Sequence, residues 1–344
     1  WLELFFDLVF VFAIAQLAHL LHSDLTWVSI AGFATLFIPV WWLWIDFSYY
    51  ADQFDIDDGP YRLVMLGVMF GLVVMALTIE DALQGGSADF AAIYTALRLV
   101  IIFLYVQAWR FVPQSRELTA RYTLSFSVAF VLWLVSIGVP EPARFWLWAV
   151  ALLIEISNGP ITYITIRNVP IQKSHMDERF GLFVIIVLGE AMVAVATGVS
   201  QTDWQWRSVL PGMGGFLTAV SLWWMYFERA DESAINKALR GGRRALRGGR
   251  RALLRSYVYG YSHVLAFMGI VATGVGIQFA IEAAAGHTFI AEARTVLCGG
   301  ITLYLIGVTL LQWASPSSLP KAVISMRAVL ALGSLSLNQA PLLM

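Results

Sequence analysis

Long apolar segments recur along the whole chain, and they limit its possible folds more than any other feature. The first segment, WLELFFDLVFVFAIAQLAHLL, has only two acidic side chains, Glu3 and Asp7. A helix needs about 20 apolar residues to cross a bilayer. Inside lipid the backbone must satisfy its own hydrogen bonds, which favours helices. The sequence therefore predicts an all-α fold, a polytopic transmembrane helical bundle.

Composition excludes a soluble globular protein. Hydrophobic residues make up 59% of the chain and charged residues 13%, and the mean hydropathy is +0.73. A soluble domain carries about 25% charged residues. The single cysteine, Cys298, excludes an intramolecular disulfide framework and a cysteine-rich metal site. The lipid bilayer is thus the first expected partner.

The apolar segments predict about eleven helices, separated by short loops rich in Pro, Gly and Asp. Their ranges are 3–22, 27–49, 61–80, 90–110, 120–139, 144–166, 179–198, 208–228, 256–282, 290–313 and 321–340. The chain starts at Trp1 and stops in an apolar segment, so we expect the natural protein to extend further. A twelfth helix is expected beyond Met344.

Basic residues orient the predicted spans. Most of the 22 lysines and arginines fall in the loops after even-numbered helices. The exceptions are Arg98, Arg144, Arg207 and Arg294. Cytoplasmic loops carry the excess of Lys and Arg in membrane proteins. We therefore expect an inner (plasma) membrane protein with a cytoplasmic N-terminus.

Weak internal similarity suggests that the chain is duplicated. The matching pairs are ELFFDLVFVF (3–12) with ERFGLFVIIV (178–187), WLWIDFSYYAD (42–52) with SLWWMYFERAD (221–231), LTIEDA (77–82) with FAIEAA (279–284), and YVQAW (105–109) with TLLQW (309–313). Their common order predicts two parallel six-helix repeats. The first covers 1–174, and the second covers 175–344 with about five helices present and a basic cytoplasmic loop at 230–255. Chance matching of apolar sequence is the alternative.

Two of these segments carry a family resemblance. ELFFDLVFVFAIAQLAHLL and ERFGLFVIIVLGEAM resemble the signature segments of the bacterial low-temperature-requirement protein A (LtrA) family, and the resemblance extends over essentially the whole chain. It implies a polytopic inner-membrane protein of a family named for a cold-growth phenotype. FFDLVFVFAI is more loosely similar to the first helix of a potassium-channel family built from six-helix units. Phe6 stands where that family has serine, so its filter chemistry does not carry over.

Acidic residues near the start of the chain are candidates for a cation path. Glu3 and Asp7 are four residues apart and share a helix face. Asp46 is expected at a similar depth near the cytoplasmic end of the second helix. Charges in spans are costly and usually face a bundle interior or a water-filled path. The three acids either form a cluster that attracts a cation or bond structurally to Trp, Tyr or Arg side chains.

The sixth predicted helix, with ALLIEISNGPITYIT (151–165), has polar residues on one face. Glu155, Asn158 and Thr162 recur at helical spacing. Pro160 removes a backbone donor and predicts a kink or a break there. Broken helices often build transport sites at the membrane midplane. The alternative is a packing helix whose kink accommodates its neighbours.

The seventh predicted helix has a single deep acid. Glu190 has no partner nearby in the sequence, which suits a proton-coupled carboxyl. Its alternative role is structural, with a hydrogen bond to a residue such as His263, Tyr259 or Gln16. Glu190 and His263 are therefore both candidates for the transport pathway.

Two acid–arginine combinations recur in the predicted repeats. Glu80 with Arg98, and Glu282 with Arg294, join the outer end of one predicted helix to the next. Because the acid and the arginine of each pair can neutralise each other, we expect structural ion pairs. An extracellular gate is the alternative.

No metal, cofactor or catalytic site is predicted. His19 and His22 close the first predicted helix, but Asp24 is the only further ligand nearby. Phosphate-binding, dinucleotide-binding, zinc-protease and serine-hydrolase motifs do not occur. The sequence therefore gives no support for an enzyme.

The segment ALRGGRRALRGGRRALLR (238–255) is strongly basic. Its predicted lipid-contacting residues are Arg240, Arg243, Arg244, Arg247, Arg250 and Arg251. Basic segments gain about 1 kcal/mol per charge at anionic headgroups. We therefore expect anionic-lipid contact at the cytoplasmic face. Nucleic-acid binding is not expected, because no aromatic residues are interleaved.

These features favour a channel or secondary transporter for a cation or a proton-coupled solute. The main alternative is an intramembrane lipid-handling protein or enzyme linked to membrane adaptation to cold. A membrane-state sensor that signals through the basic loop is a third hypothesis. The substrate and the oligomeric state, a homo-oligomer included, stay open at this level.

Overall fold

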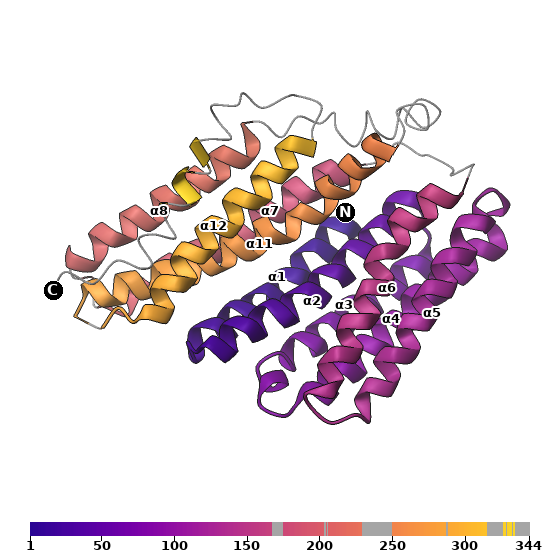
Figure 1. Ribbon diagram of the computed structural model, residues 1–344, viewed down its shortest axis with the longest axis horizontal. Coiled ribbons are helices and arrows are strands. Elements are labelled where there is room, and N and C mark those ends of the chain that lie inside the picture. Colours follow the sequence, from indigo (N-terminus) through magenta and orange to yellow (C-terminus); the bar gives the residue numbers. More distant parts are fainter. Residues whose placement is uncertain are drawn as a thin grey trace. The chain divides into compact units, whose positions relative to one another are not determined.

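The computed structural model describes residues 1–166, 175–202, 204, 206–228, 250–286, 288–314, 326, 327, 329–331 and 333. Every regular element in this part of the chain is a helix (Figure 1). The long helices are α1 (Leu2–Ser23), α2 (Trp27–Phe54), α3 (Gly59–Leu77), α4 (Ser87–Phe111), α5 (Arg116–Ile137), α6 (Ala143–Thr165), α7 (Met176–Ser200), α8 (Trp206–Phe227), α11 (Arg250–Ala284) and α12 (Ala291–Ala314). Two short 3-10 helices, η1 (Asp81–Leu83) and η2 (Pro113–Ser115), come before α4 and α5.

Nine of the described helices are long and apolar enough to cross a membrane, and α8 is not among them. This confirms the predicted all-α polytopic bundle. Several boundaries differ from the prediction by a few residues. Helix α11 begins at Arg250, so the end of the predicted basic loop is helical. The helix predicted over 321–340 lies mostly outside the described residues.

Local sequence determines where α3 begins. The Asp58 carboxylate accepts a hydrogen bond from the Tyr61 backbone N–H at 2.8 Å, and Pro60 stands in the first turn. Both are strong signals for a helix start. Next to this cap, Arg62 donates two hydrogen bonds of 2.8 Å to Asp57. These bonds lower the pKa of the exposed Asp57 carboxyl.

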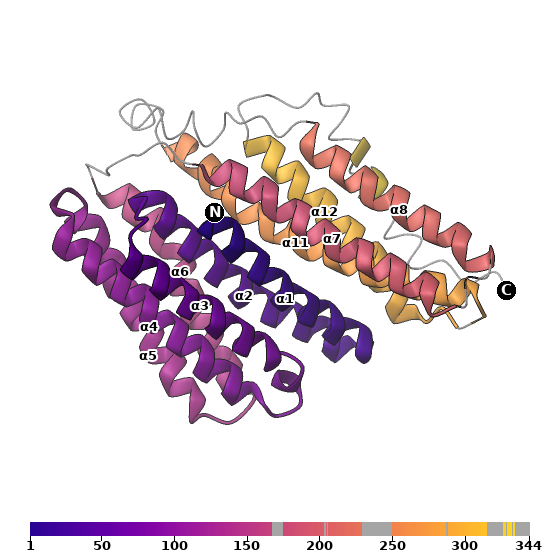
Figure 2. The same cartoon turned by 180° about the vertical axis from the view of Figure 1, so that it is seen from behind.

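Contacts divide the chain into two compact units. Among the described residues, unit 1 contains Trp1–Gln16 and Ile38–Met176, whereas unit 2 contains Leu17–Phe37 and most residues from Asp177 onwards. Helices α1 and α2 therefore contribute to both units. In unit 1, α5 packs against both α4 and α6 (Figures 1 and 2). The internal duplication stays a prediction.

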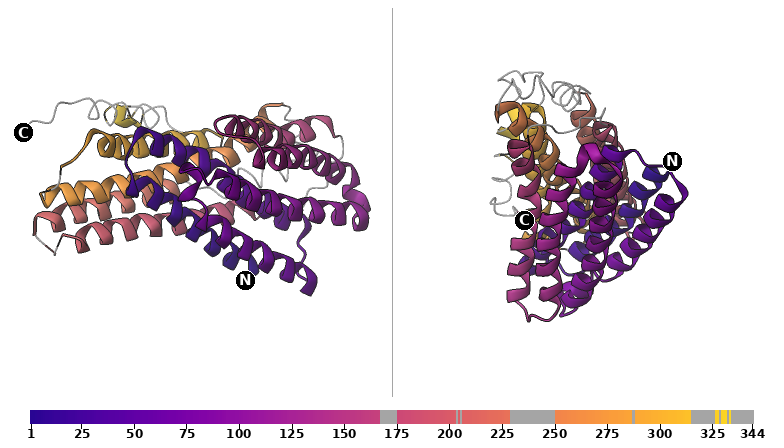
Figure 3. Two further views of the ribbon diagram at one scale, coloured as in Figure 1. Left: turned by 90° about the horizontal axis from the view of Figure 1, so that it is seen from below. Right: turned by 90° about the vertical axis from the view of Figure 1, so that its right-hand side faces the viewer.

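The core of unit 2 depends on a close approach of α11 and α12, which lie side by side in two views (Figures 1 and 3). A Cβ atom on Gly269 would lie 2.5 Å from the backbone nitrogen of Tyr304 and 2.7 Å from the carbonyl oxygen of Gly300. Small residues at helix crossings allow such backbone contact in membrane proteins. The Tyr304 hydroxyl also donates to the Leu222 carbonyl, joining α12 to α8.

Candidate functional site

Three buried charged residues connect α2, α4 and α6 in unit 1. Arg98 of α4 forms ion pairs with Asp46 of α2 and with Glu155 of α6. The distance from Arg98 Nη2 to Glu155 Oε1 is 2.7 Å. Arg98 is 0% exposed, Glu155 1% and Asp46 6%. We call Asp46, Arg98 and Glu155 the charged triad.

Helical periodicity brings Arg98 to the interior. Tyr94, Ile101 and Tyr105 are buried with it on one stripe of α4, at spacings of three and four residues. Burial of the arginine therefore follows from the face of α4 that packs against the rest of unit 1.

The triad contains two carboxylates but only one guanidinium. Burying an unpaired charge costs several kcal/mol, so each acid gains from its contact with Arg98. The guanidinium also lies over the Phe126 ring, 4.6 Å from its centroid, and the ring face attracts a cation. With all three groups ionised, the triad carries one surplus negative charge.

Two further polar residues of α6 lie on the Glu155 face, as the spacing predicts. Asn158 and Thr162 are buried, and the Thr162 hydroxyl donates to Asn158 Oδ1 at 3.2 Å. No described residue pairs with Asn158 Nδ2. The polar face of α6 therefore continues from the triad toward the C-terminal end of that helix.

The predicted break at Pro160 is wrong. Helix α6 continues through Pro160 to Thr165. Proline removes one donor, but neighbouring groups in a helical bundle can satisfy the freed carbonyl. Glu155, Asn158 and Thr162 therefore stand on one unbroken helix.

The predicted Glu80–Arg98 ion pair is also wrong. Glu80 is exposed before η1, whereas Arg98 lies deep in α4 and pairs with Asp46 and Glu155. The prediction treated Arg98 as a residue near a helix end. The long-range packing of α2 and α6 against α4 supplies its real partners.

Glu282 has a polar environment in unit 2. Gln278 Nε2 donates to Glu282 at 3.1 Å, and His22 Nε2 lies 3.4 Å from the same carboxylate oxygen. The His22 ring also stacks on Phe279, with centroids 4.6 Å apart. The pairing of Glu282 with Arg294 stays a prediction.

The three acids predicted to cluster near the N-terminus occupy different environments. Glu3 is exposed, whereas Asp7 is buried and accepts a hydrogen bond of 2.8 Å from Trp44 Nε1. Asp46 pairs with Arg98. Only Asp46 is therefore part of a buried cluster of charges, and the bond from Trp44 to Asp7 fits the structural alternative.

His263 of α11 is fully buried and held on both nitrogens. Nδ1 lies 2.8 Å from the Tyr259 carbonyl oxygen, which can only accept, so Nδ1 carries the proton. Nε2 then accepts from the Tyr226 hydroxyl at 2.9 Å. The ring stacks on Phe180, with centroids 3.9 Å apart. These contacts do not include Glu190, a half-buried residue of α7.

The predicted lipid-contacting arginines are described only in part. Arg240, Arg243, Arg244 and Arg247 lie outside the described residues. Arg250 and Arg251 form the start of α11. Anionic-lipid contact therefore stays a prediction.

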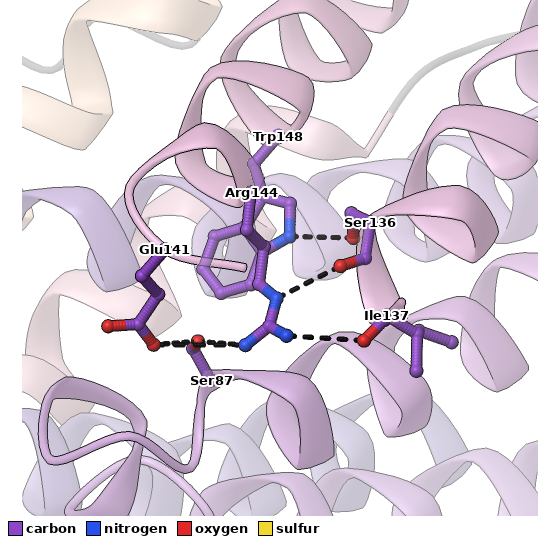
Figure 4. A network of polar contacts seen from close by, with 6 residues as sticks. All are labelled: Ser87, Ser136, Ile137, Glu141, Arg144 and Trp148. Carbon is purple, nitrogen blue, oxygen red and sulfur yellow. Dashed lines mark hydrogen bonds and ion pairs between the residues drawn. The ribbon is translucent and has the colours of Figure 1, made fainter. Parts of the chain in front are cut away.

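A polar network at one end of unit 1 was not among the residues predicted from the sequence (Figure 4). Arg144 Nε donates to the Ser136 carbonyl at 2.9 Å, and Nη2 donates to the Ile137 carbonyl at 3.1 Å. Its Nη1 donates to the Ser87 hydroxyl, which donates to Glu141. Arg144 thus binds the last carbonyls of α5 and joins them to the first residue of α4. Its position at the first residue of the predicted helix over 144–166, close to the end of the preceding helix, was the available signal.

Comparisons with known proteins agree with this architecture. Residues 1–344 match the family described as bacterial low temperature requirement A protein (LtrA). An uncharacterized protein of Rhizobium meliloti (strain 1021) is 30% identical over 335 residues, which cover 92% of this chain and 78% of the relative. No solved structure matches. The chain therefore belongs to the LtrA family of multi-pass membrane proteins.

Proposed function

We propose that this protein moves a small cation across the membrane and that the charged triad is its binding site. The observation that carries the proposal is the composition of the triad, which has two carboxyl groups around one guanidinium. Asp46 and Glu155 share one arginine in a buried environment. One proton or one monovalent metal ion neutralises the surplus negative charge. An anion would add to it.

The depth of the triad supports the proposal. Arg98 lies about 17 Å along α4 from Ser87, at about 1.5 Å per residue. The hydrocarbon core of a bilayer is about 30 Å thick. A site at this depth is near the midplane, where transporters commonly bind their ions. Intramembrane charges also commonly mark ion pathways.

Further features of this transporter are proposed on sequence grounds. The distribution of lysines and arginines supports an inner membrane location with a cytoplasmic N-terminus. The ordered sequence matches support a parallel duplication. Glu190 is a second candidate for the pathway, because acids in membrane spans are usually functional.

Replacing Glu155 with glutamine is the first test of the proposal. The variant keeps the size of the side chain and leaves Arg98 and Asp46 as a neutral pair, so we expect it to fold. We expect its cation flux to fall to the level of empty liposomes. The measurement is the flux of H⁺, K⁺ and Na⁺ in proteoliposomes of the purified full chain.

The matched control is Glu117→Gln on α5. Glu117 also pairs with an arginine, Arg121, at 3.8 Å, but its side chain is 62% exposed. Exposed pairs contribute at most about 1 kcal/mol, so this variant should conduct like the wild type. Equal flux in the Glu155→Gln protein and the wild type would exclude the triad as the binding site. Absence of any cation flux in the wild type would contradict the proposed function.

A further inference from the structure

Two fully buried polar atoms near the triad have no hydrogen-bond partner among the described residues. They are the Tyr94 hydroxyl oxygen on α4 and the Trp133 indole nitrogen on α5. Their rings contact each other, with centroids 4.1 Å apart. The two rings that carry the unsatisfied groups therefore pack against each other between α4 and α5.

Tyr94 lies directly beside the triad. It precedes Arg98 by one helical turn on α4, and the guanidinium carbon of Arg98 is 5.9 Å from the centre of the Tyr94 ring. Tyr94 therefore lies beside the arginine that pairs with both carboxylates of the triad.

The Trp133 ring also contacts Trp148, a residue of the network in Figure 4. The Trp133 ring stacks on Trp148 with centroids 4.9 Å apart, and Trp148 Nε1 donates to the Ser136 hydroxyl at 3.0 Å. Ser136 belongs to the network of Arg144, whose acid Glu141 has a side chain that is 35% exposed. Hydrogen bonds thus run from Glu141 to Trp148, and ring contacts continue from Trp148 through Trp133 and Tyr94 to Arg98 of the triad.

The chemistry of the two unsatisfied groups selects their partner. A buried polar group without a partner costs about 1–3 kcal/mol, and ordered water normally satisfies such groups. The indole N–H of Trp133 can only donate, whereas the Tyr94 hydroxyl can donate and accept. Water accepts from both. A bound anion is disfavoured by the surplus negative charge of the triad.

We propose that Tyr94 is a proton relay between ordered water at Trp133 and the carboxylate of Glu155, so that the cation moved by this protein is the proton. The inference rests on the proposed function and names its substrate. In each transfer, one O–H bond of a protonated water (H₃O⁺) breaks and its proton bonds to Tyr94 Oη, while the original O–H bond of Tyr94 breaks and the water is left neutral. The released proton passes to Glu155 through one further water, because the Tyr94 hydroxyl has no direct hydrogen bond to a described residue. The phenol stays neutral, and no electrons are exchanged.

The test is proton flux in proteoliposomes of the full chain carrying Tyr94→Phe, which removes only the hydroxyl. Acid–base groups in proton transfer contribute about 100-fold or more, so we expect the flux to fall about 100-fold. The matched control is Tyr50→Phe, because the buried Tyr50 hydroxyl already donates to the Leu104 carbonyl at 3.1 Å. We expect the control to conduct protons at the wild-type rate. Wild-type proton flux should also be slower in D₂O.

Each outcome separates the relay from the transport function. Proton flux that is equal in the wild type and in Tyr94→Phe overturns the relay and leaves the proposed function standing. Flux of K⁺ or Na⁺ without proton flux in the wild type also overturns the relay and leaves the proposed function standing. If Tyr94→Phe does not fold, Trp133→Phe removes the neighbouring N–H and should lower the proton flux. Unchanged flux in Trp133→Phe then overturns the relay.

Discussion

Replacing Arg98 with methionine is expected to lower the free energy of unfolding by about 3–5 kcal/mol. Methionine fills much of the same volume but removes the only cation of the triad. Asp46 and Glu155 would then remain buried and repel each other without a counter-charge. Acidic pH should restore part of the stability, because protonated carboxyls need no counter-charge. The measurement is reversible unfolding of the purified protein in mixed detergent micelles at neutral and acidic pH.

Arg62→Met provides the matched control for this prediction. Arg62 also forms an arginine–carboxylate pair, but its side chain is 56% exposed and that of Asp57 68%. Exposed pairs contribute at most about 1 kcal/mol, so the control should unfold close to the wild type. If Arg98→Met were as stable as Arg62→Met, the triad would not be the buried ionic cluster described above.

Substituting leucine for Gly269 is expected to cost about 3 kcal/mol or more, since overpacking a core typically costs 1–3 kcal/mol and backbone clashes add to this. Even the Cβ atom would lie 2.5 Å from the backbone nitrogen of Tyr304. Backbone atoms cannot rotate away as a flexible side chain can. Helices α11 and α12 would therefore have to separate. Thermal unfolding of the variant in detergent measures the loss.

Gly67→Leu on α3 is the control, because a Cβ atom there has no neighbour within 4 Å. Leucine has a higher helix propensity than glycine, so this variant should be neutral or slightly more stable. Similar melting temperatures for the Gly269 and Gly67 variants would show that α11 and α12 do not approach as closely as the structure has them.

The sequence predicted the helices and the polar face of α6 well, for local reasons. The length of the apolar segments predicts the membrane-spanning helices. The 3.6-residue period of a helix places Glu155, Asn158 and Thr162 on one face. The partners of Arg98 could not be predicted in this way, because they depend on which helices pack against α4. Local patterns contain no such information. One signal was available: a buried arginine requires buried acids, and Asp46 and Glu155 were already candidates.

Other residues were harder to interpret for the same physical reason. Tyr94 and Trp133 look like ordinary core aromatics in the sequence, and only the packing of α4 on α5 leaves their polar atoms without partners. His263 was a candidate for the pathway, yet Tyr226 and the Tyr259 carbonyl occupy its two nitrogens. Hydrogen-bond satisfaction is a property of the folded structure.

The most direct test of the central claim removes all charges of the triad at once. The variant Asp46→Asn/Arg98→Met/Glu155→Gln keeps the approximate side-chain volumes, and replacing a buried ionic cluster by neutral groups is often neutral or stabilising. The measurement combines its unfolding in detergent with its H⁺, K⁺ and Na⁺ flux in proteoliposomes. We predict a protein at least as stable as Arg98→Met, with no cation flux above empty liposomes. Wild-type flux in this variant would contradict the claim that the charged triad binds the transported cation.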